Sequence, residues 1–208
     1  MIHVIAKTPA NAWRNSIKEL IKLPDSKGSD LWKNTTAVVE VKDPKADLYD
    51  DLFPMSREQI GAINNYLVFG THKKEVIHEW TLLYRWRLVN ESYNQIQNIT
   101  DYLKKKPSGK RAQMSIWDPS QDLEAPIGPC LQIIFCQIID GKLELHTHMR
   151  ACDCYGKLLM NINEFAALQR YIAEQLVVEC GSYLQFMDSL HFNTEDQDKI
   201  NSLMEKFI

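Results

Sequence analysis

Two strand-like segments, one mostly apolar and one with alternating apolar and polar residues, flank a two-residue turn signal and constrain the fold more than any other feature of this chain. Leu131–Ile139 and Lys142–Met149 are joined only by Asp140-Gly141. An Asp-Gly step between two such segments is typical of a tight β-hairpin turn. The pattern therefore predicts a hairpin, within a sheet that is largely antiparallel.

Signals along the rest of the chain predict helices that pack on this sheet. Thr8-Pro9 combines an N-cap residue with proline at the first helical position, and apolar residues follow at helical spacing. Residues 24–35 are polar, contain Gly28 and predict a mobile loop. Further helices are predicted over 56–68, 91–105, 162–177 and 195–207, and further strands over 2–6, 36–41, 112–117 and 184–186. We expect an α+β fold in a single domain over residues 1–208.

The composition excludes several classes of protein. The 208 residues are enough for a full hydrophobic core, and 45% hydrophobic with 25% charged residues is typical of a soluble globular protein. The net charge of −3 gives no general attraction to nucleic acid or to an anionic membrane. We find no signal-peptide pattern and no apolar stretch near the length of about 18 residues that a membrane span needs. Five cysteines without a small-scaffold pattern predict reduced thiols in the cytoplasm.

Cys130 stands among polar residues whose types suggest covalent chemistry on an anionic substrate. Arg111 lies 19 residues before it and Arg150 lies 20 residues after it, and Asn161 and His191 follow. A thiolate is the nucleophilic form of cysteine, and a nearby guanidinium favours that form. Arg150 is the candidate for this role and could also bind phosphate through its fixed fork of donors.

Each of these signals has a plainer interpretation. A cysteine among apolar residues is usually part of the core, and a Lys-Arg pair such as Lys110-Arg111 usually lies in a solvated loop. A zinc site is a further alternative, because even spacing would place four possible ligands on one face of a single strand. These four are His146, His148, Cys152 and Cys154. Such ligands usually come in pairs on turns, so we favour ordinary strand residues and expect no metal.

Together, the motifs from about residue 80 to residue 200 resemble the thymidylate synthase family, and the shorter archaeal-type members look closest. Pro129-Cys130 resembles the family's Pro-Cys nucleophile, and Asn161-Ile162 its Asn-Ile. The other matching segments are Tyr84-Arg85-Trp86-Arg87, Lys110-Arg111, Trp117-Asp118-Pro119, Met149-Arg150-Ala151-Cys152-Asp153 and Ser189-Leu190-His191. Residues 1–79 carry the resemblance only faintly.

The resemblance implies a mechanism, a cofactor and an assembly. Cys130 would add to C6 of a pyrimidine nucleoside monophosphate, and C5 would then accept a one-carbon group from methylenetetrahydrofolate. Members of the family form homodimers through their sheets, so Lys110 and Arg111 would bind the partner's phosphate in trans. The remaining implied roles are phosphate binding by Arg150, base recognition by Asn161, sugar contact by His191, and support of folate or ordered water by Tyr84 and Asp153. A first-loop phosphate ligand is not evident, with Lys27 and Lys33 as candidates.

Several departures from the family pattern bear on the product. Ala151 replaces a serine that contacts phosphate, and Asn193 replaces a tyrosine that contacts the sugar. Leu131 follows the cysteine in place of histidine, and Lys157-Leu158-Leu159 replaces Gly-Leu-Pro. These changes favour water capture, giving a 5-hydroxymethyl group on CMP, dCMP or dUMP.

Two alternatives remain open. Asn161 favours a uracil base, because its amide can both accept and donate hydrogen bonds, and thymidylate synthesis from dUMP is the commoner activity of the family. The chain could also be a degenerate, non-catalytic homologue that only binds a nucleotide.

Overall fold

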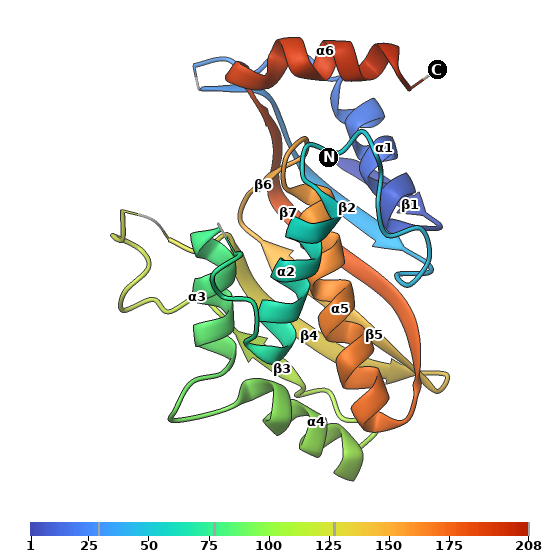
Figure 1. Ribbon diagram of the computed structural model, residues 1–208, viewed down its shortest axis with the longest axis vertical. Coiled ribbons are helices and arrows are strands. Elements are labelled where there is room, and N and C mark those ends of the chain that lie inside the picture. The colour runs from blue at the N-terminus through green and yellow to red at the C-terminus, as the bar shows by residue number, and fades with distance from the viewer. Residues whose placement is uncertain (29, 77, 127, 208) are drawn as a thin grey trace.

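The computed structural model describes residues 1–28, 30–76, 78–126 and 128–207 (Figure 1). The strands are β1 (Ile2–Ala6), β2 (Leu31–Val41), β3 (Gln113–Ser115), β4 (Leu131–Ile139), β5 (Lys142–Met149), β6 (Cys152–Asp153) and β7 (Glu179–Asn193). The helices are α1 (Pro9–Leu20), α2 (Arg57–Phe69), α3 (Glu79–Leu88), α4 (Gln95–Lys105), α5 (Leu158–Leu176) and α6 (Gln197–Glu205), with a 3₁₀ turn at Thr194–Asp196.

The strands form one seven-stranded mixed sheet in the order β1-β2-β7-β5-β4-β3, with β6 beside β7. The β2–β7, β4–β5 and β3–β4 pairs are antiparallel. The β1–β2, β5–β7 and β6–β7 pairs are parallel. The expected α+β architecture is confirmed, with more parallel pairing than the hairpin alone suggests.

The predicted hairpin is confirmed with its bounds unchanged. Its two central residues, Asp140 and Gly141, have φ values of 49° and 75°. Positive φ at both positions is the requirement of a type I′ turn, which matches the twist of the flanking strands. The hairpin places Cys130, just before β4, next to Arg150, just after β5, and the Arg150 N–H donates to the Cys130 carbonyl at 2.8 Å.

The helices cover one face of the sheet. In Figure 1, α5 and α2 cross in front of the central strands. Side chains on this face are fully buried, as in Leu145, Tyr183 and Val39. Side chains on the opposite face of the same strands are half-buried, as the alternating burial along β5 and β7 indicates. No helix among the described residues is long and apolar enough to span a membrane.

Capping residues set several helix ends, and the N-cap at Thr8 is the one that was predicted. Thr8 accepts a hydrogen bond from the Asn11 N–H at 3.3 Å and so caps α1. Ser56 and Gln59 form a reciprocal capping box at the start of α2, and Gly70, with φ of 73°, ends that helix.

Four predictions of local structure need correction. Residues 24–35 are not all loop, because β2 begins at Leu31 and pairs with β7 from that residue onward. Helix α4 begins at Gln95, where Asn94 is the N-cap, and not at residue 91. Helix α5 begins at Leu158, four residues before the predicted start, and β7 extends far beyond the predicted 184–186. Helix α3 was not predicted at all.

Candidate functional site

A cavity of about 230 Å³ brings together residues from α3, α5, β6 and the ends of β5 and β7. Its lining residues are Trp80, Tyr84, Cys130, Met149, Ala151, Cys152, Asp153, Lys157, Met160, Asn161, His191 and Asn193. Seven of them were predicted from the sequence, namely Tyr84, Cys130, Ala151, Asp153, Asn161, His191 and Asn193. A larger, more open groove between β1, α1 and α6 contains none of the predicted site residues.

The candidate nucleophile is held at one wall of this cavity by hydrogen bonds to its neighbours. Cys130 is half-buried, and the hydroxyl of Tyr84 accepts a hydrogen bond from the next backbone N–H, that of Leu131, at 3.1 Å. Burial raises the pKa of the Cys130 thiol, and the charge of Arg150 lowers it by a smaller amount. The guanidinium therefore favours the thiolate as expected, but the desolvation of the sulfur outweighs its effect on the pKa.

Arg150 fixes the turn that carries Cys130. Its Nε donates to the Pro129 carbonyl at 3.0 Å, and its Nη2 donates to the Gly128 carbonyl at 2.7 Å. These bonds satisfy two carbonyls of the turn and leave the guanidinium charge without a carboxylate partner among the described residues. A cation in that state, exposed beside the thiol, is suited to an anionic ligand.

Asp153 and His191 lie next to each other, because β6 pairs with β7 in that register. The Asp153 carboxylate accepts hydrogen bonds from the N–H groups of Tyr155 at 2.9 Å and Gly156 at 3.1 Å. Burial raises the pKa of Asp153, and the Gly156 N–H and the charge of His191 act against that rise. A Cβ at Gly156 would lie 2.8 Å from the Asp153 carboxylate, so a larger residue there would displace it.

Asn161 projects into the cavity from the first turn of α5. The side chain is 4% exposed, and its Nδ2 points to two sulfur atoms, Cys152 Sγ at 3.4 Å and Met149 Sδ at 3.6 Å. Sulfur is a weak acceptor, so these contacts orient the amide without saturating it. The amide therefore keeps hydrogen-bonding capacity for a ligand.

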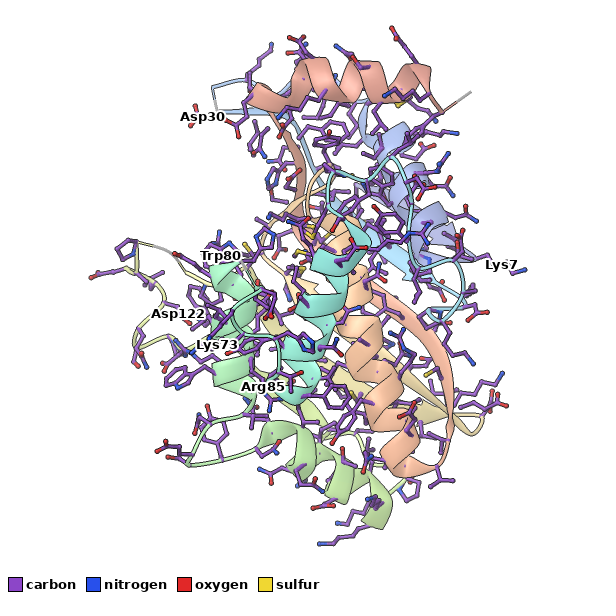
Figure 2. All side chains as sticks on the ribbon, viewed as in Figure 1. Lys7, Asp30, Lys73, Trp80, Arg85 and Asp122 are labelled. Atoms are coloured by element: carbon purple, nitrogen blue, oxygen red, sulfur yellow. The ribbon has the colours of Figure 1, made fainter. Side chains whose placement is uncertain are left out.

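Sequence reasoning missed the wall of the cavity that α3 and Lys157 form. Trp80 lies at the start of α3, the helix with no clear apolar periodicity, and Figure 2 labels it there. The Lys157 ammonium lies 2.9 Å from His78 Nδ1. Burial and the charge of Lys157 lower the pKa of His78 to about 4, so this imidazole is neutral at physiological pH and accepts from the lysine. Lys157 was visible in the sequence only as a departure from Gly-Leu-Pro.

Lys110 and Arg111 lie outside the cavity of their own chain. The neighbouring Ala112 carbonyl accepts a hydrogen bond from the Cys136 N–H at 2.8 Å, which places Arg111 near Cys136 on β4. Six extended residues separate Cys136 from Cys130, a span of about 20 Å. An arginine side chain does not cover that distance, so Arg111 does not reach Cys130 of its own chain.

The two first-loop candidates differ in environment. Lys33 is 6% exposed and is bound to the Asp25 carboxylate at 2.7 Å and to the Leu23 carbonyl, so it supports the chain turn before β2. Lys27 is exposed and remains the candidate for an anion.

The four possible zinc ligands do not share a face. Strand β5 ends at Met149, so His146 and His148 lie on the half-buried face of the sheet, whereas Cys152 and Cys154 are buried. Among the described residues no three His, Cys, Asp or Glu side chains are grouped to hold a metal ion.

Comparison with known proteins agrees with this geometry. The family model described as thymidylate synthase matches residues 8–207. The chain belongs to the thymidylate synthase family. A protein named "Putative thymidylate synthase" from Methanosarcina acetivorans is 24% identical over 204 residues, covering 96% of this chain and 93% of that protein. One of the same name from Methanocaldococcus jannaschii is 22% identical, covering 92% and 90%. A "Thymidylate synthase" from Bacillus mojavensis is 25% identical, covering 97% of this chain and 65% of that protein.

Membership confirms the predicted family and establishes the general chemistry. The chain is a one-carbon transferase of the thymidylate synthase family, whose members bind a pyrimidine nucleotide and use methylenetetrahydrofolate as co-substrate. The cavity is compatible with folate, because the rings of Trp80 and Tyr84 offer apolar surfaces for a flat heterocycle. Lys157 and Asp153 supply a hydrogen-bond donor and an acceptor in the same cavity.

Proposed function

We propose that Cys130 forms a covalent bond to C6 of a pyrimidine nucleoside monophosphate, and that the product is the 5-hydroxymethyl nucleotide of CMP, dCMP or dUMP. The observation that carries the choice of product is a set of three polar side chains in the largely apolar lining of the cavity that contains Cys130. These are Lys157, Asp153 and Asn193, and polar groups of this kind can hold water near the reacting carbon.

The protein's own groups prepare the nucleophile. Arg150 and Tyr84 hold the backbone on both sides of Cys130, so the sulfur approaches the base in one orientation. The raised pKa of the thiol means that the sulfur carries its proton in the free protein and loses it when it attacks C6, while the phosphate sits beside a guanidinium that is already fixed. Arg150 thereby acts as both a positioning residue and a phosphate ligand in this proposal.

The substrate would lie with its base toward α5 and its sugar toward the end of β7. Asn161 offers an amide to the base edge, while His191 and Asn193 are placed for sugar hydroxyls. Ala151 offers no hydroxyl at the phosphate end. Asn193 is smaller than tyrosine, which supports a sugar pocket with room for a ribose 2′-hydroxyl.

Folate, when bound, supplies the carbon atom at the oxidation level of formaldehyde. Trp80, Tyr84, Lys157 and Asp153 would hold it. What these residues decide is access of water: a dry wall favours hydride capture and a methyl product, and a hydrated wall favours the hydroxymethyl product.

A homodimer would complete the phosphate site. Lys110 and Arg111 are exposed and lie about 20 Å along β4 from Cys130, which supports a role at the phosphate of a neighbouring copy. The half-buried face of the sheet supports such an assembly, because it carries Phe135 and Phe186 among its central residues. All five cysteines are free, which supports a reducing compartment such as the cytoplasm.

Thymidylate synthesis from dUMP is the second candidate. Asn161 favours it, because its amide matches both the O4 acceptor and the N3–H donor of uracil.

Product mass separates the candidates. The protein is incubated with methylenetetrahydrofolate and, in separate reactions, with dUMP, dCMP, UMP and CMP. We expect a gain of about 30 Da with tetrahydrofolate returned, whereas a gain of about 14 Da with dihydrofolate would establish the methyl product. No product and no covalent adduct with any of the four would indicate a nucleotide-binding homologue, with Cys130→Ser as the control for the adduct.

A further inference from the structure

A fully buried carboxyl group without a hydrogen-bond partner lies one helical turn beyond Asn161. Glu164 is 0% exposed, and neither Oε1 nor Oε2 has a partner among the described residues. Burying a carboxyl group without a hydrogen bond costs folding free energy, so we expect such a side chain to have a function. The reactions assigned above do not use it.

Glu164 lies where α5 packs between α3 and β7. Its neighbour Phe165 stacks near Tyr84 with ring centroids 6.3 Å apart. Thr81, one turn before Tyr84 on α3, is close enough to lower the pKa of Glu164, yet its hydroxyl is itself buried without a hydrogen bond. The titratable groups that interact with Glu164 are Tyr84 from α3 and Tyr183 from β7.

These two tyrosines differ in their remaining hydrogen-bonding capacity. Tyr183 is engaged on both sides, since its hydroxyl contacts Thr147 at 2.8 Å and donates to Gln185 Oε1 at 2.8 Å. Within the described part of the chain, the Tyr84 hydroxyl accepts one hydrogen bond, from the Leu131 N–H, and donates none, so its own proton is available. Tyr84 also lines the cavity and interacts electrostatically with Cys130 as well as with Glu164. It therefore links the reacting centre with the buried carboxyl.

We propose that Glu164 is a proton-storing residue for the C5 chemistry, acting on the nucleotide through the hydroxyl of Tyr84. The proposal rests on the proposed function, because it requires the Cys130 adduct. When the sulfur–C6 bond forms, the C5=C6 π pair becomes available at C5. C5 takes a proton from the Tyr84 hydroxyl, and Tyr84 recovers one from the Glu164 carboxylic acid through a bridging water molecule, because no direct hydrogen bond joins the two groups. In reverse, the C5–H bond breaks, its proton passes to Tyr84, and the Tyr84 proton passes through the same water to the Glu164 carboxylate.

The charge state of Glu164 suits this exchange. Burial raises its pKa from 4.5 to about 8. A carboxyl group with this pKa is mostly protonated at neutral pH and can release and recover a proton near the working pH, as an efficient acid–base group must. It acts through Tyr84, so Glu164 is a positioning and proton-storing residue and does not touch the substrate.

The test is exchange of the C5 hydrogen without folate. Wild-type protein, Glu164→Gln, Glu164→Asp and Tyr183→Phe are incubated with nucleotide carrying deuterium at C5, and loss of the label to water is followed against pH. We expect Glu164→Gln to bind nucleotide normally but to exchange about a hundredfold more slowly, with no pH limb near 8. Glu164→Asp should recover part of the rate and the limb, and Tyr183→Phe should exchange like the wild type.

The outcomes separate the two proposals. If the wild type neither forms the adduct nor exchanges the label, the proposed function fails. If the wild type exchanges and Glu164→Gln matches it, or slows while keeping the limb, the role of Glu164 is overturned. If Glu164→Gln does not fold, infrared spectra of the wild type decide: a protonated-carboxyl band absent at pH 7, or unchanged through pH 8, overturns the proposal.

Discussion

The two faces of the sheet carry side chains from the same strands, but they differ in burial and in the types of residue that they present. Beneath the helices, Met149 and Met187 are at most 1% exposed, and the cavity opens at this level. One position along, on the other face, the side chains are only half-buried. There Phe186 pairs laterally with Val38 on β2 and with His148 on β5, and the His148 and Phe186 rings meet at 4.8 Å.

The difference follows from the two-residue period of a strand. Each strand directs half of its side chains toward the helices, where the core and the cavity lie. The other half lies on the opposite face, which carries aromatic residues together with histidine and glutamate. A monomeric sheet would carry mostly polar residues on a face without helices. One face thus forms the cavity, and the other is suited to a second copy of the chain, as the homodimer proposal requires.

The largest effect is expected on the helix-covered side. Cys130→Ser should lower turnover by on the order of 10⁴-fold or more, because an alcohol does not replace a thiolate in attack on C6. The matched control is Cys180→Ser, at the far end of β7, which should retain wild-type turnover. Steady-state kinetics with purified protein measure both, and full turnover in Cys130→Ser would remove the nucleophile assignment.

A negative charge on the half-buried face of the sheet should disrupt the proposed homodimer. Phe186→Glu should reduce the mass in light scattering from twice 24.2 kDa to 24.2 kDa. Turnover should fall about a hundredfold, because the charge-assisted phosphate contacts of Lys110 and Arg111 are lost. Val177→Glu, at a residue that is 90% exposed, is the control and should change neither. A fully active monomer would show that the two cations do not act in trans.

The stability of the protein should depend on pH through Glu164, which lies on the helix-covered side of the sheet. Because the pKa of Glu164 is raised to about 8 in the folded protein, its contribution to stability is full below 4.5 and is lost as pH rises toward 8. The free energy of unfolding of Glu164→Gln minus that of the wild type should therefore grow by about 1.4 kcal/mol per pH unit across this window. Denaturant titrations between pH 4 and pH 9 measure it, and a constant difference would contradict the buried carboxyl.

The smallest expected effect is at the phosphate end of the cavity. Ala151→Ser adds one hydroxyl, and a hydrogen bond of about 1 kcal/mol should lower the nucleotide Kd roughly fivefold without changing kcat. Calorimetric titration with the nucleotide measures the change. Ala151→Val, which has no hydroxyl, is the control, and equal tightening in both variants would argue against a phosphate contact.

The parts of the fold that the sequence predicts well are those where local chemistry decides the backbone. Asp140-Gly141 defines the hairpin, and Thr8-Pro9 and Ser56 define two helix starts. Strand β7 was recognised only over 184–186 because Gly181, Ser182 and Asp188 interrupt its apolar pattern. Pairing with both β2 and β5 holds these residues in the strand, and that is a tertiary effect.

Helix α3 was missed because its apolar residues have no helical periodicity. It carries two arginines whose partners are distant in sequence. Arg85 donates to the carbonyls of Leu67 and Val68 at the end of α2, and Arg87 is 7% exposed and pairs with Asp122 at 2.9 Å. In Figure 2, Asp122 lies in the loop beside this helix. Such contacts cannot be inferred from a local sequence pattern. Because α3 was not predicted, Trp80 at its start was not recognised as a cavity residue either.

The candidate site was predicted where residue types and spacings together resemble the thymidylate synthase family, because each residue alone has a plainer interpretation. Cys130, Asn161 and His191 are of that kind, and the cavity brings them together. Lys157 and Glu164 were not recognised, because a lysine at a helix start and a glutamate within a helix are ordinary in sequence. Only their surroundings distinguish them: a neutral histidine beside one, and an apolar interior around the other.

The contact between Arg150 and the turn of Cys130 also bears on the order in which the molecule assembles. Arg150 reaches back 21 and 22 residues to Pro129 and Gly128, and the chain between them is the β4–β5 hairpin. Hairpins of this kind form within about 1–10 μs, well before distant helices dock. We expect the nucleophile and its cation to be in register early in folding, while α3 and α5 have yet to enclose the substrate. The reactive centre is in this sense a local unit, and the rest of the chain is what makes it selective.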